Sequence, residues 1–314
     1  MQVYTMGNGS AQSDLSSYRS TENYLIVADF GEVEGIREAL GIAGPMKKGS
    51  KSKRVDDFIR FESNDGYDYV GFVSFELRDS RFSFERVGIY YGRNFLLFVT
   101  KDEKERHEGI VEDLKAARSS AGDGKEELAF LYYRVFNGAL SRMFDSLSRY
   151  EETLGGMEVK ILTSPGRDDF EKIVRMKGMS FRLKKCLRLL LLVGDELGQN
   201  ENRLVPAKLV KSFRHLDSKI NRLYEFAEGI HEMSEHLMDL YDSTVTSRTN
   251  NLLGKLTIIT VFATPLTVIT GVYGMNFVNM PELQNRYGYF IVLGVMAVSI
   301  SLTYLALKKL KVLK

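Results

Sequence analysis

Threonine hydroxyls recur along one stripe of an uncharged segment near the C-terminal end of the chain. The stripe runs through Leu253, Thr257, Thr260, Thr264, Thr267 and Gly271. Steps of four and three residues place these positions on one face of a helix. Two interpretations remain open. Each hydroxyl can bond a carbonyl of the preceding turn and pack against a neighbouring helix, or the hydroxyls together can line a narrow, wet channel.

Residues for other kinds of chemistry are scarce. Cys186 is the only cysteine, which excludes an intramolecular disulfide framework and any multi-cysteine metal centre. The chain has 4 histidines and no nucleophile–base pair, metal-ligand cluster or glycine-rich phosphate loop that we recognise, so we expect it not to be an enzyme. Its 43 Lys and Arg nearly balance 41 Asp and Glu, and we therefore expect no nucleic-acid partner.

Two segments near the C-terminus are long and apolar enough to cross a lipid bilayer. Residues 256–281 form a run of 26 without a charged side chain, and residues 287–307 form another of 21. A helix that crosses the hydrocarbon layer needs about 20 apolar residues. The rest of the chain is polar, so the sequence predicts a large soluble domain anchored by two membrane spans.

The distribution of Lys and Arg predicts how these spans are oriented. Positive charges flank their cytoplasmic-type ends at Arg248, Lys255, Lys308, Lys309, Lys311 and Lys314. The connector between the spans carries only Arg286. The positive-inside rule then places both termini in the cytoplasm, with the chain in the cell (plasma or inner) membrane. Residues 1–20 lack the apolar core of a signal peptide, and we interpret them as a disordered lead.

The polar two-thirds of the chain predicts strands first and helices afterwards. Apolar runs and alternation indicate strands within 24–29, 55–62, 67–77, 82–91 and 94–100, with a short helix over 31–40. Charged faces beside apolar stripes indicate helices over 103–121, 125–154 and 168–197, with breaks at glycines such as Gly155–Gly156. We expect an α+β or α/β cytoplasmic domain whose sheet is covered by helices.

A heptad seam precedes the first span. Its positions are Leu209, Phe213, Leu216, Ile220, Leu223, Ala227, Ile230, Ser234, Leu237, Tyr241 and Thr244. No proline falls between Ala207 and Thr264, so the seam predicts one helix from Ala207 to Tyr273, about 100 Å long at about 1.5 Å per residue. Such a seam indicates packing of helix on helix, and we expect its partners to be other copies of the chain.

The predicted domain organisation follows from these segments. It comprises a disordered lead at 1–20, the cytoplasmic α/β domain with a helical hairpin at 21–206, a coiled-coil-like stalk helix at 207–251, a first transmembrane helix at 252–276, an extracellular loop at 277–287, a second transmembrane helix at 288–307 and a basic cytoplasmic tail at 308–314.

The end of the first span carries the most specific motif. Tyr-Gly-Met-Asn-Phe at 273–277 follows a Pro-Leu-Thr span, and Met-Pro-Glu-Leu at 280–283 precedes the second span. Together with Ser-Arg-Thr-Asn at 247–250 and Leu-Thr-Ile-Ile at 256–259, this arrangement resembles the CorA family of magnesium channels. The resemblance implies a CorA-like homopentamer, with the first span lining a central pore and the second span outside it.

The resemblance also implies roles for individual residues. Gly274, Met275 and Asn276 would form a selectivity ring at the outer mouth, and Asn250 an inner polar ring. The implied pore-facing positions are Leu253, Leu256, Thr260, Thr264 and Thr267, which largely coincide with the threonine stripe. Neutral amide oxygens at such a ring can bind the water shell of Mg²⁺, which sheds water reluctantly. The transported ion would be chiefly Mg²⁺, with Co²⁺ and Ni²⁺ as further substrates.

This sequence departs from the family pattern at two places. A hydroxyl at Thr264 stands where the family often has a bulky apolar residue, so we assign the hydrophobic gate to Leu253 and Leu256. The family's regulation by intracellular Mg²⁺ relies on acidic residues between subunits, whereas one such stalk position holds His215. We therefore leave any regulatory metal site unassigned and interpret Glu225, Glu228, Glu232, Glu235 and Asp239 as solvated flanks.

Two alternatives to a magnesium channel stay open. A zinc transporter of the same architecture would show the same spans and stalk, although the intact Met275 and Asn276 favour magnesium. A membrane-anchored oligomeric sensor would explain the heptads but gives no reason for the threonine stripe.

Overall fold

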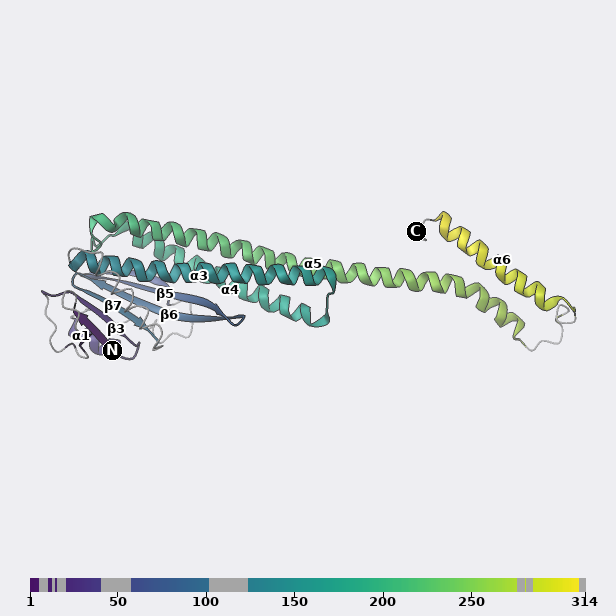
Figure 1. Cartoon of the computed structure of the whole chain (residues 1–314), viewed down its shortest axis with the longest axis horizontal. Helices are drawn as coiled ribbons and strands as arrows, with labels where there is room; N and C mark the ends of the chain where they lie inside the picture. Colours follow the sequence, from purple (N-terminus) through teal and green to yellow (C-terminus); the bar gives the residue numbers. More distant parts are fainter. Residues whose placement is uncertain are drawn as a thin grey trace. The chain divides into compact units, whose positions relative to one another are not determined.

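The structure of the chain is a computed structural model that describes residues 1–5, 11–12, 15, 21–40, 58–101, 124–275, 280 and 285–310 (Figure 1). It divides into two compact units, Met1–Leu240 and Tyr241–Lys314. The predicted helix over 103–121 and most of the loop that follows the first span lie outside the described residues.

The first unit is built on a mixed seven-stranded sheet. Its strands are β1 (Gln2–Thr5), β2 (Ala11–Gln12), β3 (Tyr24–Ala28), β4 (Arg60–Asn64), β5 (Tyr67–Arg78), β6 (Arg81–Gly92) and β7 (Phe95–Thr100). They lie in the order β2-β1-β3-β7-β6-β5-β4. Only the central pair, β3 and β7, is parallel; every other described pair is antiparallel. Four of the five predicted strand segments correspond to β3, β5, β6 and β7, and the fifth, 55–62, overlaps β4 at residues 60–62, while its residues 55–57 lie outside the described residues.

The two longest strands form a hairpin whose turn is set by local chemistry. Asp79 and Ser80 join β5 to β6 and have φ values of 46° and 63°. Two successive positive φ values are typical of a type I′ turn, whose twist matches that of the flanking strands. The pairing of Arg78 with Arg81 fixes the register of all twelve residue pairs back to Tyr67 and Gly92.

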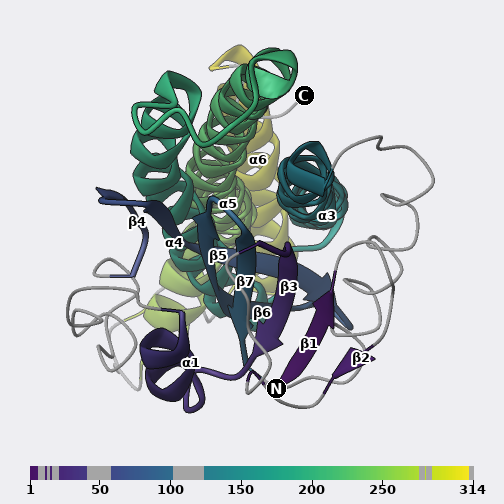
Figure 2. The same ribbon diagram turned by 90° about the vertical axis from the view of Figure 1, so that its left-hand side faces the viewer.

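Both faces of the centre of the sheet are covered. Every residue of β3 and β7 is buried, which requires packing partners above and below. Helix α1 (Val33–Ala39) buries Val33 and Ile36 against one face, beside Ile26 and Leu97. Figure 2 shows α3 (Gly124–Thr163) and α4 (Arg167–Gln199) on the other side of the sheet. There the ring of Phe72 meets that of Phe136 edge-on at 4.8 Å.

The N-terminal residues correct one prediction. Gln2–Thr5 was expected to be part of a disordered lead, but it forms strand β1. Val3 pairs with Ile26 of β3 and is only 1% exposed. The reason is that β3 would otherwise expose a row of unpaired backbone groups on this side, and a short strand covers them.

The helical hairpin is longer than its glycines predict. α3 continues through Gly155 and Gly156 to Thr163, so the predicted break there is wrong. Leu154 and Ile161 are fully buried on either side of the two glycines. Burial of these apolar side chains stabilises the helix by more than the roughly 1 kcal/mol per glycine that the backbone costs.

Helix α5 (Ala207–Tyr273) is continuous over 67 residues, as the sequence predicts. Its seam residues Phe213, Ile220, Leu223 and Leu237 are all buried within the single chain. The expectation that the seam packs against other copies is therefore wrong over residues 213–237. The partners are helices of the same chain: the ring of Phe213 lies 5.1 Å from that of Tyr132 on α3.

A buried carboxylate fixes the turn between α3 and α4. Asp169 accepts a hydrogen bond from the backbone N–H of Gly166 at 2.8 Å and forms an ion pair with Lys160. The hydrogen bond from Lys160, reinforced by that from Gly166, holds the pKa of Asp169 below its ordinary value. A depressed pKa means that the ionised form stabilises the folded state above the ordinary Asp pKa, and that this contribution is lost as the pH falls through the lower, folded value.

We expect Asp169→Asn to lower the melting temperature of the purified protein at pH 7, because the amide cannot pair with Lys160. The difference from wild type should stay constant above about pH 5 and shrink below about pH 4. Thermal unfolding across this pH range checks it, with a substitution of the exposed neighbour, Asp168→Asn, as matched control. Equal effects of both substitutions at pH 7 would contradict the assignment.

The second unit contains the apolar end of α5 and helix α6 (Gly288–Lys309). Both helices are long and apolar enough to cross a membrane. α6 ends in Lys308 and Lys309, whose positive charges stabilise the negative, C-terminal end of the helix dipole. Nearly all side chains of both apolar segments are left uncovered by the chain itself, as expected of surfaces that meet lipid or another subunit.

Candidate functional site

The threonines of the first span share one hydrogen-bonding pattern. Thr257, Thr260, Thr264 and Thr267 each donate the hydroxyl proton to the carbonyl four residues earlier, at 2.7–2.9 Å. Thr270, which the stripe did not include, does the same with Leu266. The hydroxyl protons therefore bond carbonyls of the preceding turn, as the first of the two interpretations of the stripe expects.

This pattern leaves the hydroxyl oxygens as acceptors. A threonine hydroxyl has one proton and two lone pairs, and the proton is committed to the backbone here. The oxygen can therefore only accept further hydrogen bonds. A stripe of such oxygens on one helix face suits a partner that presents O–H donors, and the water shell of a cation is such a partner, because its protons point outward. All of these threonines are exposed in the single chain.

The apolar and amide positions predicted beside the stripe are also exposed. Leu253 and Leu256 are 54% and 59% exposed, and Asn250 lies uncovered one turn before them. Among the described residues, these side chains find no cover within the chain.

The first span ends at the glycine of the motif. The N–H of Gly274 bonds the carbonyl of Thr270 at 2.9 Å, and that of Met275 bonds the carbonyl of Val272 at 3.2 Å. A Cβ at position 274 would stand 3.0 Å from the Thr270 oxygen, so a side chain there would press on the last helical turn. Met275 is 47% exposed, and Asn276 lies outside the described residues.

A hollow of about 580 Å³ lies between the end of α5 and the start of α6. Tyr273, Gly274, Arg286 and Tyr289 are among its lining residues. Tyrosines at this level are typical of the membrane–water boundary. Arg286 brings positive charge close to Gly274, which opposes the accumulation of cations there.

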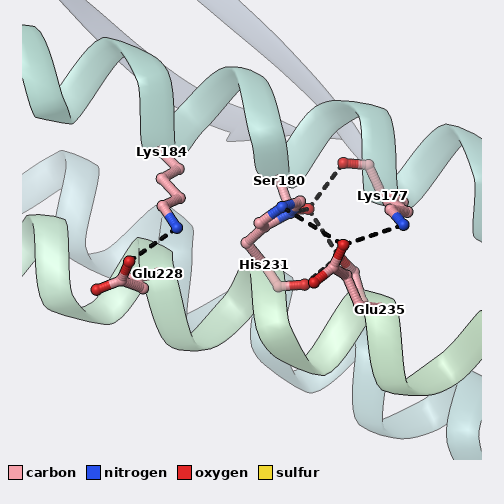
Figure 3. A network of polar contacts seen from close by, with 7 residues as sticks. Lys177, Ser180, Lys184, Glu228, His231 and Glu235 are labelled. Carbon is pink, nitrogen blue, oxygen red and sulfur yellow. Dashed lines mark hydrogen bonds and ion pairs between the residues drawn. The ribbon is translucent and has the colours of Figure 1, made fainter.

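The sequence did not predict a buried polar contact between α4 and α5, which Ser180, His231 and Ser234 form (Figure 3). Ser180 and Ser234 are fully buried, with their hydroxyl oxygens 2.7 Å apart. Nδ1 of His231 lies 3.0 Å from the Ser180 oxygen. The one available signal was Ser234 at a core position of the heptad seam, where a polar residue indicates a specific buried contact.

Ion pairs flank this contact and involve two of the stalk acids, which remain partly solvated as the sequence predicts. Lys177 pairs with Glu235 at 3.1 Å, and Lys184 pairs with Glu228 at 2.8 Å. These hydrogen bonds lower the pKa of both glutamates. Because the side chains of Glu228 and Glu235 are 40% and 51% exposed, water screens these pairs and they add little stability between α4 and α5. No group of three or more His, Cys, Asp or Glu side chains that could hold a metal occurs among the described residues.

The first unit is a helix-covered sheet, and its last helix, α5, continues into the first of two apolar helices near the C-terminus. This organisation is that of a two-span membrane protein. A family model described as CorA-like Mg²⁺ transporter protein matches residues 50–309. The chain therefore belongs to this family.

Curated relatives carry the same family name. The chain is 29% identical over 187 residues to the cobalt/magnesium transport protein CorA of Thermotoga maritima. The aligned residues cover 60% of this chain and 53% of that protein. It is 27% identical over 218 residues to the protein of the same description from Methanocaldococcus jannaschii, with 68% and 67% covered. The chain thus spans about half the length of the first of these relatives.

Two full-length solved structures share the fold over nearly the whole chain, and a solved cytoplasmic domain shares it over part of the chain. The complete CorA magnesium transporter of M. jannaschii superposes with a TM-score of 0.79 at 20% identity, covering 98% of this chain and 96% of that one. The full-length CmaX protein gives a TM-score of 0.73 at 16% identity, with 99% and 97% covered. The ZntB cytoplasmic domain of Vibrio parahaemolyticus gives 0.61 at 14% identity, with 79% and 98% covered. The predicted fold class, a helix-covered sheet followed by a long helix and two spans, is confirmed.

Proposed function

We propose that the chain is one subunit of a homopentameric channel that passes divalent cations, chiefly Mg²⁺, across the cell membrane, with both termini in the cytoplasm. Family membership supports the class of activity. The observation that carries the proposal is the row of hydroxyl oxygens at Thr260, Thr264 and Thr267, whose protons are all bonded to the backbone. Five copies around one axis would surround the ion path with acceptors.

Such acceptors suit a hydrated ion. Mg²⁺ gives up its water slowly, and its water shell donates hydrogen bonds outward. Neutral oxygens bind this shell without holding the ion as tightly as carboxylates would, so the ion can leave again. Gly274, Met275 and Asn276 would select the ion at the outer mouth, and Asn250 would supply an inner polar ring. Co²⁺ and Ni²⁺ have water shells of similar size and would follow the same path.

The membrane potential would drive the flux. Moving one charge through 100 mV is worth about 2.3 kcal/mol, so a divalent ion gains about twice that on entering a cell with a negative interior. No other energy source is required by this proposal.

The second candidate is the zinc transporter of the same architecture that the sequence leaves open; the likeness to the ZntB domain, at 14% identity, concerns the fold alone. The two candidates differ in substrate and coupling, because a zinc carrier would move Zn²⁺ with a proton gradient. The intact Met275–Asn276 pair keeps magnesium as the leading proposal.

Ion flux into proteoliposomes that contain the purified protein tests the proposal. We expect Mg²⁺ uptake at an imposed inside-negative potential without a proton gradient. Zn²⁺ uptake that requires a proton gradient, with no Mg²⁺ uptake, would favour the zinc candidate. A folded oligomer that passes no divalent ion would overturn both and favour a membrane-anchored sensor.

The gate proposal gives its own prediction. We expect Leu253→Ala or Leu256→Ala to raise the resting leak of Mg²⁺ by about tenfold or more, because a smaller apolar side chain no longer excludes water from the closed pore. Basal flux in the same vesicles checks it. Leu252→Ala is the matched control, since Leu252 is similarly exposed but is not among the implied pore-facing positions. Unchanged closure in both gate variants would contradict the assignment.

A further inference from the structure

The first unit contains a pocket that lies outside the threonine stripe and the Gly-Met-Asn motif. It has a volume of about 640 Å³ and lies where the tip of the β5–β6 hairpin meets α3 and α4. The hairpin, α3 and α4 each contribute residues to its lining. This volume falls within the range of small-molecule sites, about 300–1,000 Å³.

The inner wall of the pocket is largely apolar, and three polar groups of its lining residues are bonded within the chain. The Tyr150 hydroxyl donates to the carbonyl of Met176 at 2.9 Å, and the Thr153 hydroxyl to that of Arg149 at 2.9 Å. The N–H of Leu77 bonds the Ser146 hydroxyl at 3.2 Å. These donors are therefore not available to bond a polar ligand, and the inner wall favours an apolar one.

The wall is also adaptable. Met157, Met176 and Met179 are half-buried and line the pocket together with Phe82, whose ring packs edge-on against that of Tyr150 at a centroid distance of 5.1 Å. Methionine side chains are flexible and polarisable, and they are common on surfaces that accept apolar chains of varied shape. An unbranched hydrocarbon chain fits such a wall.

The rim of the pocket is positively charged. Arg81, Lys172 and Arg175 belong to the lining, and no Asp or Glu does. Arg175 contacts Glu171 at 3.4 Å, but both side chains are mostly exposed, so water screens this pair. Lys172 stands 3.8 Å from an Asp169 oxygen that Lys160 already holds. An anionic group at the rim would thus meet three cations without a competing carboxylate in the pocket.

We propose that this pocket binds a single acyl chain that carries an anionic head group, either a carboxylate or a phosphate. The chain would lie against the methionines and Phe82, and the head group would bond Arg81 and Arg175 at the rim. Burial of about ten methylenes supplies the affinity, and the charged rim orients the ligand.

The chain contains no tryptophan, which permits a direct test. Phe82→Trp places a reporter in the pocket of the full-length protein in lipid nanodiscs. Phe144→Trp is the matched control, since Phe144 is also on the first unit and 44% exposed but does not line the pocket. We expect 12-bromododecanoate to quench the indole introduced by Phe82→Trp with saturation and to leave the control reporter unaffected.

The role of charge is tested in the same background. We expect R81E/R175E to raise the half-saturating concentration by about tenfold or more, and 12-bromododecan-1-ol to bind as weakly. Competition by dodecanoate and by dodecyl phosphate then tells which head group is preferred. Met179→Trp replaces the first reporter if Phe82→Trp does not fold.

Three outcomes would overturn the proposal. The first is quenching that rises linearly and equally in both reporters, which would mean partition of the probe into lipid. The second is saturable quenching that R81E/R175E leaves unchanged. The third is failure of both unbrominated anions to compete with the probe.

Discussion

Asn276→Ala is expected to reduce Mg²⁺ uptake by at least about tenfold. In a pentamer the substitution removes five amide oxygens from the ring that is proposed to bind the ion's water shell. Each lost hydrogen bond is worth roughly 1 kcal/mol, so losing even two of the five without compensation reaches tenfold. Uptake in proteoliposomes at a fixed inside-negative potential measures the loss.

The matched control is Asn285→Ala. Asn285 is an exposed amide that precedes α6, and its oxygen accepts a hydrogen bond from the N–H of Tyr287 at 3.0 Å. It is chemically identical but stands outside the Gly-Met-Asn motif, and we expect uptake to stay within about twofold of wild type. Equal losses in the two variants would mean that the outer mouth does not depend on Asn276 in particular.

Leu223→Ala is expected to lower the free energy of unfolding by about 2–5 kcal/mol. Leu223 is fully buried in the middle of the α5 seam, and truncation removes its contacts and leaves a cavity inside the helical layer. Its neighbour Arg222 is exposed on the same helix, so Arg222→Ala is the matched control and should change stability by less than about 0.5 kcal/mol. Thermal or denaturant unfolding of the purified protein measures both.

This experiment also tests the packing of the seam within the chain. Because the partners of Leu223 belong to the same chain, we expect Leu223→Ala to lower the melting temperature without changing the oligomeric state below that temperature. A variant that dissociates into stable, folded single subunits would instead show that the seam joins different copies.

The membrane-spanning elements could be predicted from sequence because their signal is local. A charge-free run of 26 residues and another of 21 depend on composition alone, and the structure has apolar helices at both places. The continuity of α5 from Ala207 to Tyr273 was equally predictable, since apolar periodicity and the absence of proline before position 265 act along one helix. The strand segments followed from alternation in the same way.

Packing partners were not predictable, because an apolar stripe does not specify what covers it. The seam through Ile220 and Leu223 was expected to meet other copies, and the structure covers it with α3 and α4 of the same chain. The glycines at 155–156 predicted a break, but burial of Leu154 and Ile161 keeps α3 continuous. Val3 became part of the sheet only because β3 required a neighbour on that side.

Residue type and spacing along single elements were enough to define the two spans, the long helix, the threonine stripe and the Gly-Met-Asn motif. What lies across from these elements became known only from the packed chain. Packing joined Ser180 to Ser234 over 54 positions of sequence, and it brought the β5–β6 turn to three methionines of α3 and α4. Contacts between distant segments depend on how the elements pack against one another, and that information is not present in any local pattern.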